Sequence, residues 1–298
     1  MRNIVYYTSG LTGSGRLVRG LSIGTALARQ NTDSAFIIVS SCRLGFLAKL
    51  CGFRHIQIPI ENEEQLSYEN YRQSLLYSTL TELDPDILIV DLQWFSLASF
   101  IDELECKKVF LCTQLNISHI DEIYFTIKLA DRALRFDPDQ YDLLVEAEPT
   151  NVSLAMKKID PLIIRDRNEI LTREEALRQL NLEGQDKVCL FAFNGKPGEF
   201  EEKKKMYSYL EDEGYAMVYT TNYRHGLFPA VDYFNAFDLL ITGAGYNAFW
   251  EAVYFKKEAI FCPQERRFEN QRLRIETCMD YEFDENGADQ LVKLLAGL

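Results

Sequence analysis

The stretch from Ile241 to Ala252, ITGAGYNAFWEA, joins an apolar run to a turn of two glycines and then to an apolar segment with one glutamate. If the segment from Tyr246 is helical, Asn247 and Glu251 share one face because they are four residues apart. A glycine turn between a strand and a helix leaves the first helical N–H groups unpaired, and the helix dipole adds about half a positive charge there. We therefore expect a diphosphate at this turn and the Glu251 carboxylate on ribose hydroxyls. The alternative for Glu251 is a solvated carboxylate on an exposed helix face.

A second glycine turn lies near the N-terminus, where TSGLTGSGRLVRG follows the strand-like run NIVYYT. Its glycines are Gly10, Gly13, Gly15 and Gly20. The alternative for both turns is that glycine only permits positive φ or close helix packing. Two such turns in one chain favour a phosphate ligand. The NAD fingerprint is absent because Val18 stands where a third glycine is wanted, and a Walker loop is absent because Pro197 follows Gly195-Lys196.

The composition argues against several classes of protein. The chain has 298 residues, 47% of them hydrophobic, and a net charge of −13. So acidic a chain lacks the clustered Lys and Arg that displace counterions from nucleic acid, so no nucleic-acid partner is expected. The seven cysteines are scattered without a C-x-x-C pair, which argues against a zinc ribbon or a disulfide framework. With no leader peptide and no apolar run long enough to span a bilayer, the sequence predicts a cytoplasmic protein.

Short apolar runs alternate with longer amphipathic runs, which is typical of α/β proteins. The expected strands of the first half are NIVYYT, AFIIVS, HIQIPI, DILIVD and KVFLCT, and the expected helices are 16–30 and 64–83. Strands that are apolar on both faces predict a parallel sheet covered by helices. A charged, proline-containing segment at 134–167 resembles a linker, and a second α/β series follows it. We therefore expect two doubly wound domains, 1–160 and 161–298, with a ligand cleft between them.

Metal ligation is not expected. The histidines His55, His119 and His225 lie far apart, with no cysteine or carboxylate at ligand spacing. The two D-x-D strings, which begin at Asp84 and Asp137, each contain a proline and are expected to form turns rather than to hold a divalent ion. The sequence therefore predicts neither a metal ion nor a bound cofactor.

The stretch DLLITGAGYNAFWEAVYFKKEAIFCPQERRFENQRLRI, from Asp238 to Ile275, resembles the donor-binding stretch of the MurG-like glycosyltransferases, which are family 28-like. Those proteins carry a glycine turn, a helix with Glu-Ala, a proline-containing loop and then an N-Q or Q-Q pair. The segments TGSGRLVRGLSIGTALA and IDPLIIRDRNEILTREEALRQLNL parallel the family's first loop and interdomain region. The resemblance implies the GT-B fold, in which an N-terminal acceptor-side domain and a C-terminal donor-binding domain, both Rossmann-like, face a central cleft.

The resemblance also implies the residues of a donor site for a nucleotide sugar. These are the phosphate contacts Gly243, Gly245, Tyr246 and Asn247, the ribose contact Glu251, the sugar contacts Asn270 and Gln271, and the opposite wall, Asn194 and Gly195. Taken without the family, Asn270 and Gln271 are ordinary residues of a helix surface.

The N-terminal loop departs from the family at one position. The expected acceptor and phosphate loop comprises Gly13, Ser14, Gly15, Arg16 and Arg19. The family has a histidine after the second glycine, a candidate for activating the acceptor, and this chain has Arg16. Arginine stays charged and cannot act as a general base, although it can bind phosphate or a carboxylate-bearing sugar. Asp91, at the end of DILIVD, is the substitute candidate for the base, and its alternative is to cap a helix that begins near Trp94.

The favoured function is the transfer of a sugar from a nucleotide-diphosphate sugar, UDP-linked by the resemblance, to an acceptor hydroxyl, with inversion and without metal. Two alternatives stay open. One is a nucleotide-sugar hydrolase that uses water as acceptor, and the other is a non-catalytic nucleotide-sugar-binding protein, suggested by the lost histidine. The acceptor, whether small molecule, glycan or lipid-linked, is not specified by the sequence. Peripheral membrane contact also stays open, although no basic amphipathic stretch is found.

Overall fold

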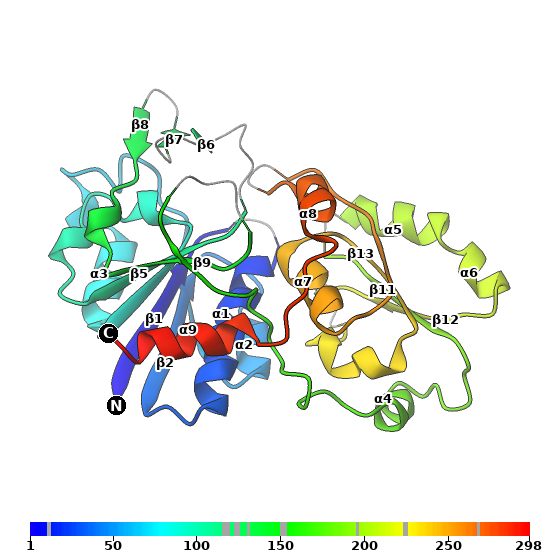
Figure 1. Ribbon diagram of the computed structural model, residues 1–298. Coiled ribbons are helices and arrows are strands. Elements are labelled where there is room, and N and C mark those ends of the chain that lie inside the picture. Colours follow the sequence, from blue (N-terminus) through cyan, green and yellow to red (C-terminus); the bar gives the residue numbers. More distant parts are fainter. Residues whose placement is uncertain are drawn as a thin grey trace.

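The chain folds into two α/β lobes that lie side by side, each built on its own parallel sheet (Figure 1). The structure is a computed structural model that describes residues 1–10, 13–114, 120–121, 126–129, 132–149, 154–194, 197–222, 226–266 and 269–298. The strands of the first sheet come from residues 2–158 and those of the second from 188–261. The expected α/β class with two doubly wound sheets is confirmed, and the boundary at residue 160 stays a prediction.

The first lobe contains a seven-stranded parallel sheet in the order β10-β9-β5-β4-β1-β2-β3. Its strands are β1 (Arg2–Thr8), β2 (Ser34–Ser40), β3 (Arg54–Gln57), β4 (Ile87–Asp91), β5 (Lys107–Cys112), β9 (Leu143–Glu146) and β10 (Lys157–Lys158). Its helices are α1 (Gly15–Arg29), α2 (Phe46–Leu50) and α3 (Leu75–Leu83). All five residues of β4 are buried, as the continuous apolar pattern of a strand covered on both faces predicts.

The second lobe contains a four-stranded parallel sheet in the order β12-β11-β13-β14. Its strands are β11 (Val188–Ala192), β12 (Ala216–Thr220), β13 (Leu239–Thr242) and β14 (Ala259–Phe261). Its helices are α4 (Arg173–Gln179), α5 (Pro197–Met206), α6 (Tyr209–Asp212), α7 (Tyr246–Tyr254) and α8 (Gln271–Cys278). A capping box begins α4, since the Thr172 and Glu175 side chains each bond the other's backbone N–H.

Three segments differ from the sequence-based expectation. The helix expected at 64–83 is confined to α3, because Ser74 caps it and the Glu61 carboxylate accepts the N–H groups of Leu75 and Leu76. The expected linker at 134–167 supplies strands β9 and β10 to the first sheet. A small antiparallel sheet of β6 (Ile120–Asp121), β7 (Thr126–Leu129) and β8 (Arg132–Arg135) was not expected. These strands are short and have polar neighbours, so the alternation of apolar and polar residues that indicates a strand is too weak to be recognised in the sequence.

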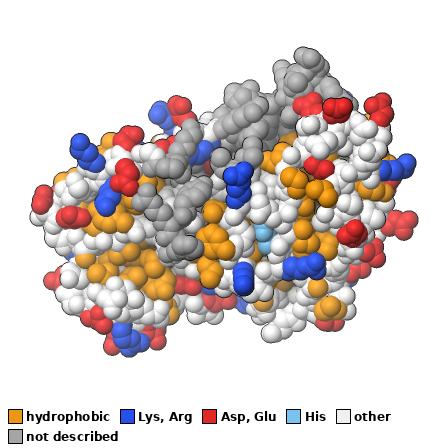
Figure 2. All heavy atoms as spheres, turned by 180° about the vertical axis from the view of Figure 1, so that it is seen from behind, with side chains coloured by type: hydrophobic (Ala, Val, Ile, Leu, Met, Phe, Trp, Pro, Cys, Tyr) orange, Lys and Arg blue, Asp and Glu red, His pale blue; other side chains and the backbone are white. Residues whose placement is uncertain are grey.

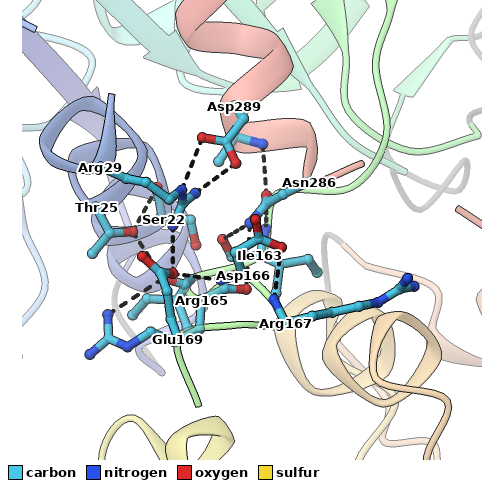
Figure 3. Close-up of polar contacts among 12 residues, drawn as sticks. Ser22, Thr25, Arg29, Ile163, Arg165, Asp166, Arg167, Glu169, Asn286 and Asp289 are labelled. Carbon is cyan, nitrogen blue, oxygen red and sulfur yellow. Dashed lines mark hydrogen bonds and ion pairs between the residues drawn. The ribbon is translucent and has the colours of Figure 1, made fainter. Parts of the chain in front are cut away.

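The two lobes are joined by more than the linker. Helix α9 (Gly287–Leu295) follows the second lobe in sequence but lies along α1 of the first lobe (Figure 1). Arg29 of α1 forms a two-bond ion pair with Asp289 of α9 and also pairs with Glu169, just after the linker (Figure 3). Side chains of both lobes belong to one continuous hydrophobic cluster. The two lobes are therefore packed against each other and are not held together by the linker alone.

The start of α9 is fastened to the linker by its backbone and by one asparagine. The Asn286 side chain accepts the N–H of Ile163 at 3.0 Å and donates to its carbonyl at 2.8 Å, while capping α9 through Ala288 N (Figure 3). The Gly287 N–H bonds the Pro161 carbonyl at 3.1 Å. A side chain at Gly287 would overlap the Asp160 carbonyl oxygen, so glycine permits this close approach.

Candidate functional site

A cavity of about 840 Å³ opens between the lobes at the carboxyl ends of both parallel sheets. It is lined by the segments that follow β1, β4 and β5 in the first lobe and β11, β13 and β14 in the second. Strand order reverses at β1 and β4 in one sheet and at β11 and β13 in the other. Such switch points are where α/β proteins bind ligands. The cleft expected between the two domains is therefore present.

The two glycine turns meet in this cavity. Asn247 at the start of α7 donates its side-chain amide to the Gly15 carbonyl at 2.9 Å, and Asn222 donates to the Ser14 hydroxyl at 2.7 Å. Gly13 has φ of 85°, a backbone conformation that glycine adopts readily. The expected loop residues Gly13, Ser14, Gly15, Arg16 and Arg19 all line the cavity. The structure thus brings the N-terminal loop against the expected phosphate turn.

The N-terminus of α7 is only partly free for an anion. The Tyr246 N–H bonds the Glu269 carboxylate at 3.0 Å, and the Ala244 N–H bonds the Gln271 carboxamide at 3.2 Å. Burial raises the pKa of Glu269, but the charge and hydrogen bonds of Arg274 outweigh it and hold the pKa below its usual value. Within the described part of the chain, the N–H groups of Asn247 and Ala248 have no acceptor. The expected phosphate contact through Tyr246 is thereby corrected, because the chain's own carboxylate occupies that N–H.

Arg16 is a cation without a carboxylate partner in the cavity. Its guanidinium donates to the Ser9 carbonyl, and it forms no ion pair with a described residue. Burial lowers the pKa of Arg16, while the nearby Asp91 opposes this effect. An arginine guanidinium stays protonated at neutral pH and presents several donors to phosphate oxygens. Arg16 is therefore available to an anionic ligand.

Asp91 is not available to a substrate, which corrects the expectation that it acts as the base. It is completely buried and is not among the residues that line the cavity. Both its carboxylate oxygens accept from Arg19, at 2.9 Å each, and the Tyr6 hydroxyl donates to one of them. It does not cap the helical turn at Trp94 either. The pair fixes Arg19 beneath the loop, so Arg19 reaches the cavity with its charge already neutralised.

A second buried network crosses from one lobe to the other. Glu148, just after β9, accepts from Nε and Nη2 of the Arg274 guanidinium at 2.9 and 3.0 Å, and from the Trp250 indole at 2.6 Å. It also accepts the Gln114 N–H at 2.7 Å. The guanidinium groups of Arg19 and Arg274 both lie over the Tyr246 ring, 4.9 and 5.8 Å from its centroid. The sequence analysis missed Glu148, Arg274 and Gln114. They lie far apart in the chain, and no local motif indicates that they contact one another.

Of the remaining residues expected to contact the donor, some line the cavity and others do not. Asn194 lines the cavity and accepts the Asn222 N–H at 2.6 Å, whereas Gly195 lies outside the described residues. Gln271 lines the cavity, but its oxygen is bonded to Ala244 N and Gln264 N. Asn270 caps α8 through the Leu273 N–H and is not among the cavity-lining residues. The structure gives no support to Asn270 as a sugar contact.

Glu251 lies one turn beyond Asn247 on α7, as expected, but it is not among the residues that line the cavity. Burial, reinforced by the negative charge of Asp232, raises the pKa of Glu251 to about 8, and Arg165 acts in the opposite direction. Among the described residues, the Glu251 carboxyl has no hydrogen-bond partner. The side chain is only partly buried, and its oxygens are not among the enclosed polar atoms without a partner, so water reaches the carboxyl in the free protein.

Other expectations concern metals and membranes. In the described ranges, no group of three or more His, Cys, Asp or Glu side chains is placed to hold a metal ion. The D-x-D string at 137–139 forms a turn in which Asp137 accepts the Asp139 N–H. His119 and His225 lie outside the described residues, and His55 bonds the Ser40 hydroxyl at 2.8 Å. None of the described helices has the length and apolar character needed to cross a bilayer.

The back of the molecule shows charges of both signs. Figure 2 shows Lys and Arg side chains scattered singly among Asp and Glu side chains on this face. The described part of this face therefore presents no continuous basic surface of the kind that grips nucleic acid.

The fold of the chain is that of the GT-B glycosyltransferases. The spinosyn forosaminyltransferase SpnP matches with a TM-score of 0.60 at 14% identity, over 99% of this chain and 91% of that one. Streptomyces sp. SF2575 SsfS6 in complex with thymidine diphosphate matches with a TM-score of 0.56 at 11% identity, over 89% and 83%. Phytolacca americana UGT2 in complex with UDP-2-fluoroglucose and pterostilbene matches with a TM-score of 0.53 at 12% identity, over 100% and 89%.

The sequence itself matches no protein-family model. It also matches no curated protein sequence. Acinetobacter baumannii MurG is among the matching structures, at a TM-score of 0.50. The expected GT-B fold is thus confirmed, while the assignment to a MurG-like family within it stays a prediction.

Proposed function

We propose that the protein is a glycosyltransferase that binds a nucleotide-diphosphate sugar in the cleft and transfers the sugar to an acceptor hydroxyl. The observation that carries the proposal is the meeting of two anion-binding groups from different lobes. These are the open N–H groups of Asn247 and Ala248 at the start of α7 and the guanidinium of Arg16, which forms no ion pair with a described residue. Together they can stabilise the leaving diphosphate without a metal ion. UDP or thymidine diphosphate is the proposed nucleotide, because two structures of the same fold bind one of them.

A second candidate is a nucleotide-sugar-binding protein without transferase activity. One observation favours it, since the carboxylate expected to act as the base, Asp91, is enclosed by Arg19 and Tyr6. Product analysis separates the candidates. Free sugar formed without an acceptor indicates hydrolysis, a glycosylated product from an acceptor panel indicates transfer, and binding without turnover indicates the non-catalytic protein. The cytoplasmic location stays a prediction.

Replacing Arg16 with glutamine is expected to weaken UDP or thymidine diphosphate binding about tenfold to a hundredfold. The physical reason is the loss of charge-assisted hydrogen bonds to the diphosphate, each worth about 1.5–3 kcal/mol. Titration calorimetry of wild type and variant measures the change. Arg54→Gln is the matched control, since Arg54 is exposed and lies outside the cavity lining. If both variants lost the same affinity for the nucleotide, or if Arg16→Gln lost none, the assignment of Arg16 as a phosphate contact would be refuted.

Nucleotide binding is expected to release a proton near pH 7 through Glu251, which we propose as the ribose contact. Because its pKa is raised to about 8, Glu251 is mainly protonated in the free protein. Ribose hydroxyls donate to the carboxylate form, so binding favours loss of the proton. Calorimetry in phosphate and Tris buffers, which differ in ionisation enthalpy, measures the protons released. Glu251→Gln is expected to abolish the buffer dependence, and equal dependence in the two proteins would rule out the ribose contact.

The same shift has a consequence for stability. The folded protein holds the Glu251 proton more tightly than the unfolded chain, whose Glu pKa is about 4.3. The unfolding free energy contributed by this group is therefore highest below pH 4.3 and falls as the pH rises toward 8. Glu251→Gln should flatten this part of the pH profile of the unfolding midpoint.

A further inference from the structure

Three residues that line the cavity each carry a buried polar atom without a hydrogen-bond partner. These atoms are Gln114 Oε1 in the first lobe and Asn247 Oδ1 and Gln264 Nε2 in the second, and none has a partner among the described residues. Gln114 itself is only 4% exposed. A buried polar atom that lacks a hydrogen bond costs about 1–3 kcal/mol, so three of them on residues of one cavity call for a partner that the described chain does not supply.

The surrounding contacts fix which way two of these carboxamides point. Asn247 donates its Nδ2 to the Gly15 carbonyl at 2.9 Å, which leaves its oxygen without a donor. Gln264 accepts from the Arg266 guanidinium at its Oε1, which leaves its nitrogen without an acceptor. The Gln114 side chain forms no hydrogen bond with a described residue, although its backbone N–H is bonded to Glu148. The fixed groups thus leave one oxygen and one N–H donor unsatisfied, and the Gln114 carboxamide can turn either its oxygen or its nitrogen to a ligand.

An anionic group alone cannot satisfy the unpaired atoms of these three carboxamides. Phosphate and carboxylate oxygens can accept from Gln264 Nε2, but they have no hydrogen to give to Asn247 Oδ1. Hydroxyl groups both donate and accept. A moiety with several hydroxyls can therefore satisfy all three atoms, and it needs no charge to do so.

We propose that Gln114, Asn247 and Gln264 form the subsite for the hydroxyls of the transferred sugar, in place of the Asn270 and Gln271 pair that the sequence suggested. The inference rests on the proposed function, because it assumes a nucleotide sugar in the cleft. The hydrogen bonds of Glu148 connect the Gln114 backbone with Arg274, which bonds the Ala244 carbonyl directly in front of α7. This chain of contacts holds Gln114 of the first lobe next to the α7 turn of the second. The sugar is thereby gripped by both lobes, whereas the diphosphate is held by Arg16 and α7.

The test compares nucleotide with nucleotide sugar in Gln114→Leu and Gln264→Met. Calorimetry measures the affinities of UDP, UDP-glucose, thymidine diphosphate and TDP-glucose for each protein. Each variant is expected to keep the nucleotide affinity of wild type and to lose about threefold to tenfold in affinity for the matching nucleotide sugar, the contribution of one neutral hydrogen bond. Asn270→Ser keeps a capping oxygen at the start of α8 and serves as the control, with unchanged affinity for all four probes.

Thermal unfolding of the free proteins supplies an independent readout. Because Gln114→Leu removes a buried polar atom that has no partner, its melting temperature without ligand is expected to equal or exceed that of wild type. A lower melting temperature would show that Gln114 serves the fold. If nucleotide and nucleotide sugar bind but both variants keep the wild-type preference between them, the sugar subsite is refuted while the proposed function stands. If neither nucleotide binds wild type, the proposed function and the subsite both fail.

Discussion

Gly287→Ala is expected to destabilise the protein by at least about 3 kcal/mol, by breaking the attachment of α9 to the linker. A methyl group there would overlap the carbonyl oxygen of Asp160 and approach that of Pro161 to 2.8 Å. These are backbone atoms, so no side-chain rotation relieves the overlap. The start of α9 must shift, and the Asn286 bonds to Ile163 are lost with it.

Urea unfolding of wild type and variant measures this cost. Limited proteolysis then shows whether α9 has detached from α1. Gly198→Ala is the matched control, because nothing lies within 4 Å of the added methyl group and alanine favours the helix in which Gly198 lies. The control is expected to be neutral or slightly stabilising. Equal stability of the two variants would show that the contact at Gly287 is not tight.

Arg274→Leu is expected to cost about 3–5 kcal/mol, because it leaves the Glu148 carboxylate buried without its counter-charge. The two side chains are 1% and 0% exposed, and Glu148 would keep only the Trp250 and Gln114 N–H donors. Urea unfolding again provides the measurement. Adding Glu148→Gln to the variant should recover much of the loss, since the remaining group is then neutral and still accepts hydrogen bonds.

The comparison for this prediction is an exposed pair in the second lobe. Arg173 and Asp238 are 41% and 38% exposed, and Arg173→Leu is expected to cost no more than about 1 kcal/mol. If the two arginine variants lost equal stability, the interlobe network would contribute no more than a surface ion pair.

The sequence predicted the elements whose signal is local. β1, β2 and β4 are continuous apolar runs, and the start of α7 coincides with the glycine turn that suggested it. Burial of both sheet faces leaves no alternating pattern, which is why a parallel sheet could be inferred. The sequence also predicted a glycine turn after a strand in each domain, and the structure brings Gly15 against Asn247 because both turns lie at the carboxyl ends of their sheets.

The partners of the charged side chains could not be predicted. Glu269 neighbours the expected sugar contact Asn270, but it reaches back to the N–H of Tyr246 and takes one of the positions assigned to phosphate. Asp91 ends a strand at the correct edge of the sheet, yet Arg19, a full turn into α1, encloses it. Such pairings depend on how distant segments of the chain pack within each lobe, and sequence spacing does not encode them.

The path of α9 has a consequence for dividing this protein into modules. If the chain were cut at residue 160, the first lobe would lose α9. The apolar residues of α1 that α9 covers would then be exposed. A chimaera that exchanges donor specificity should therefore replace only the segment between the linker and Asn286, and retain the native final helix with the native first half.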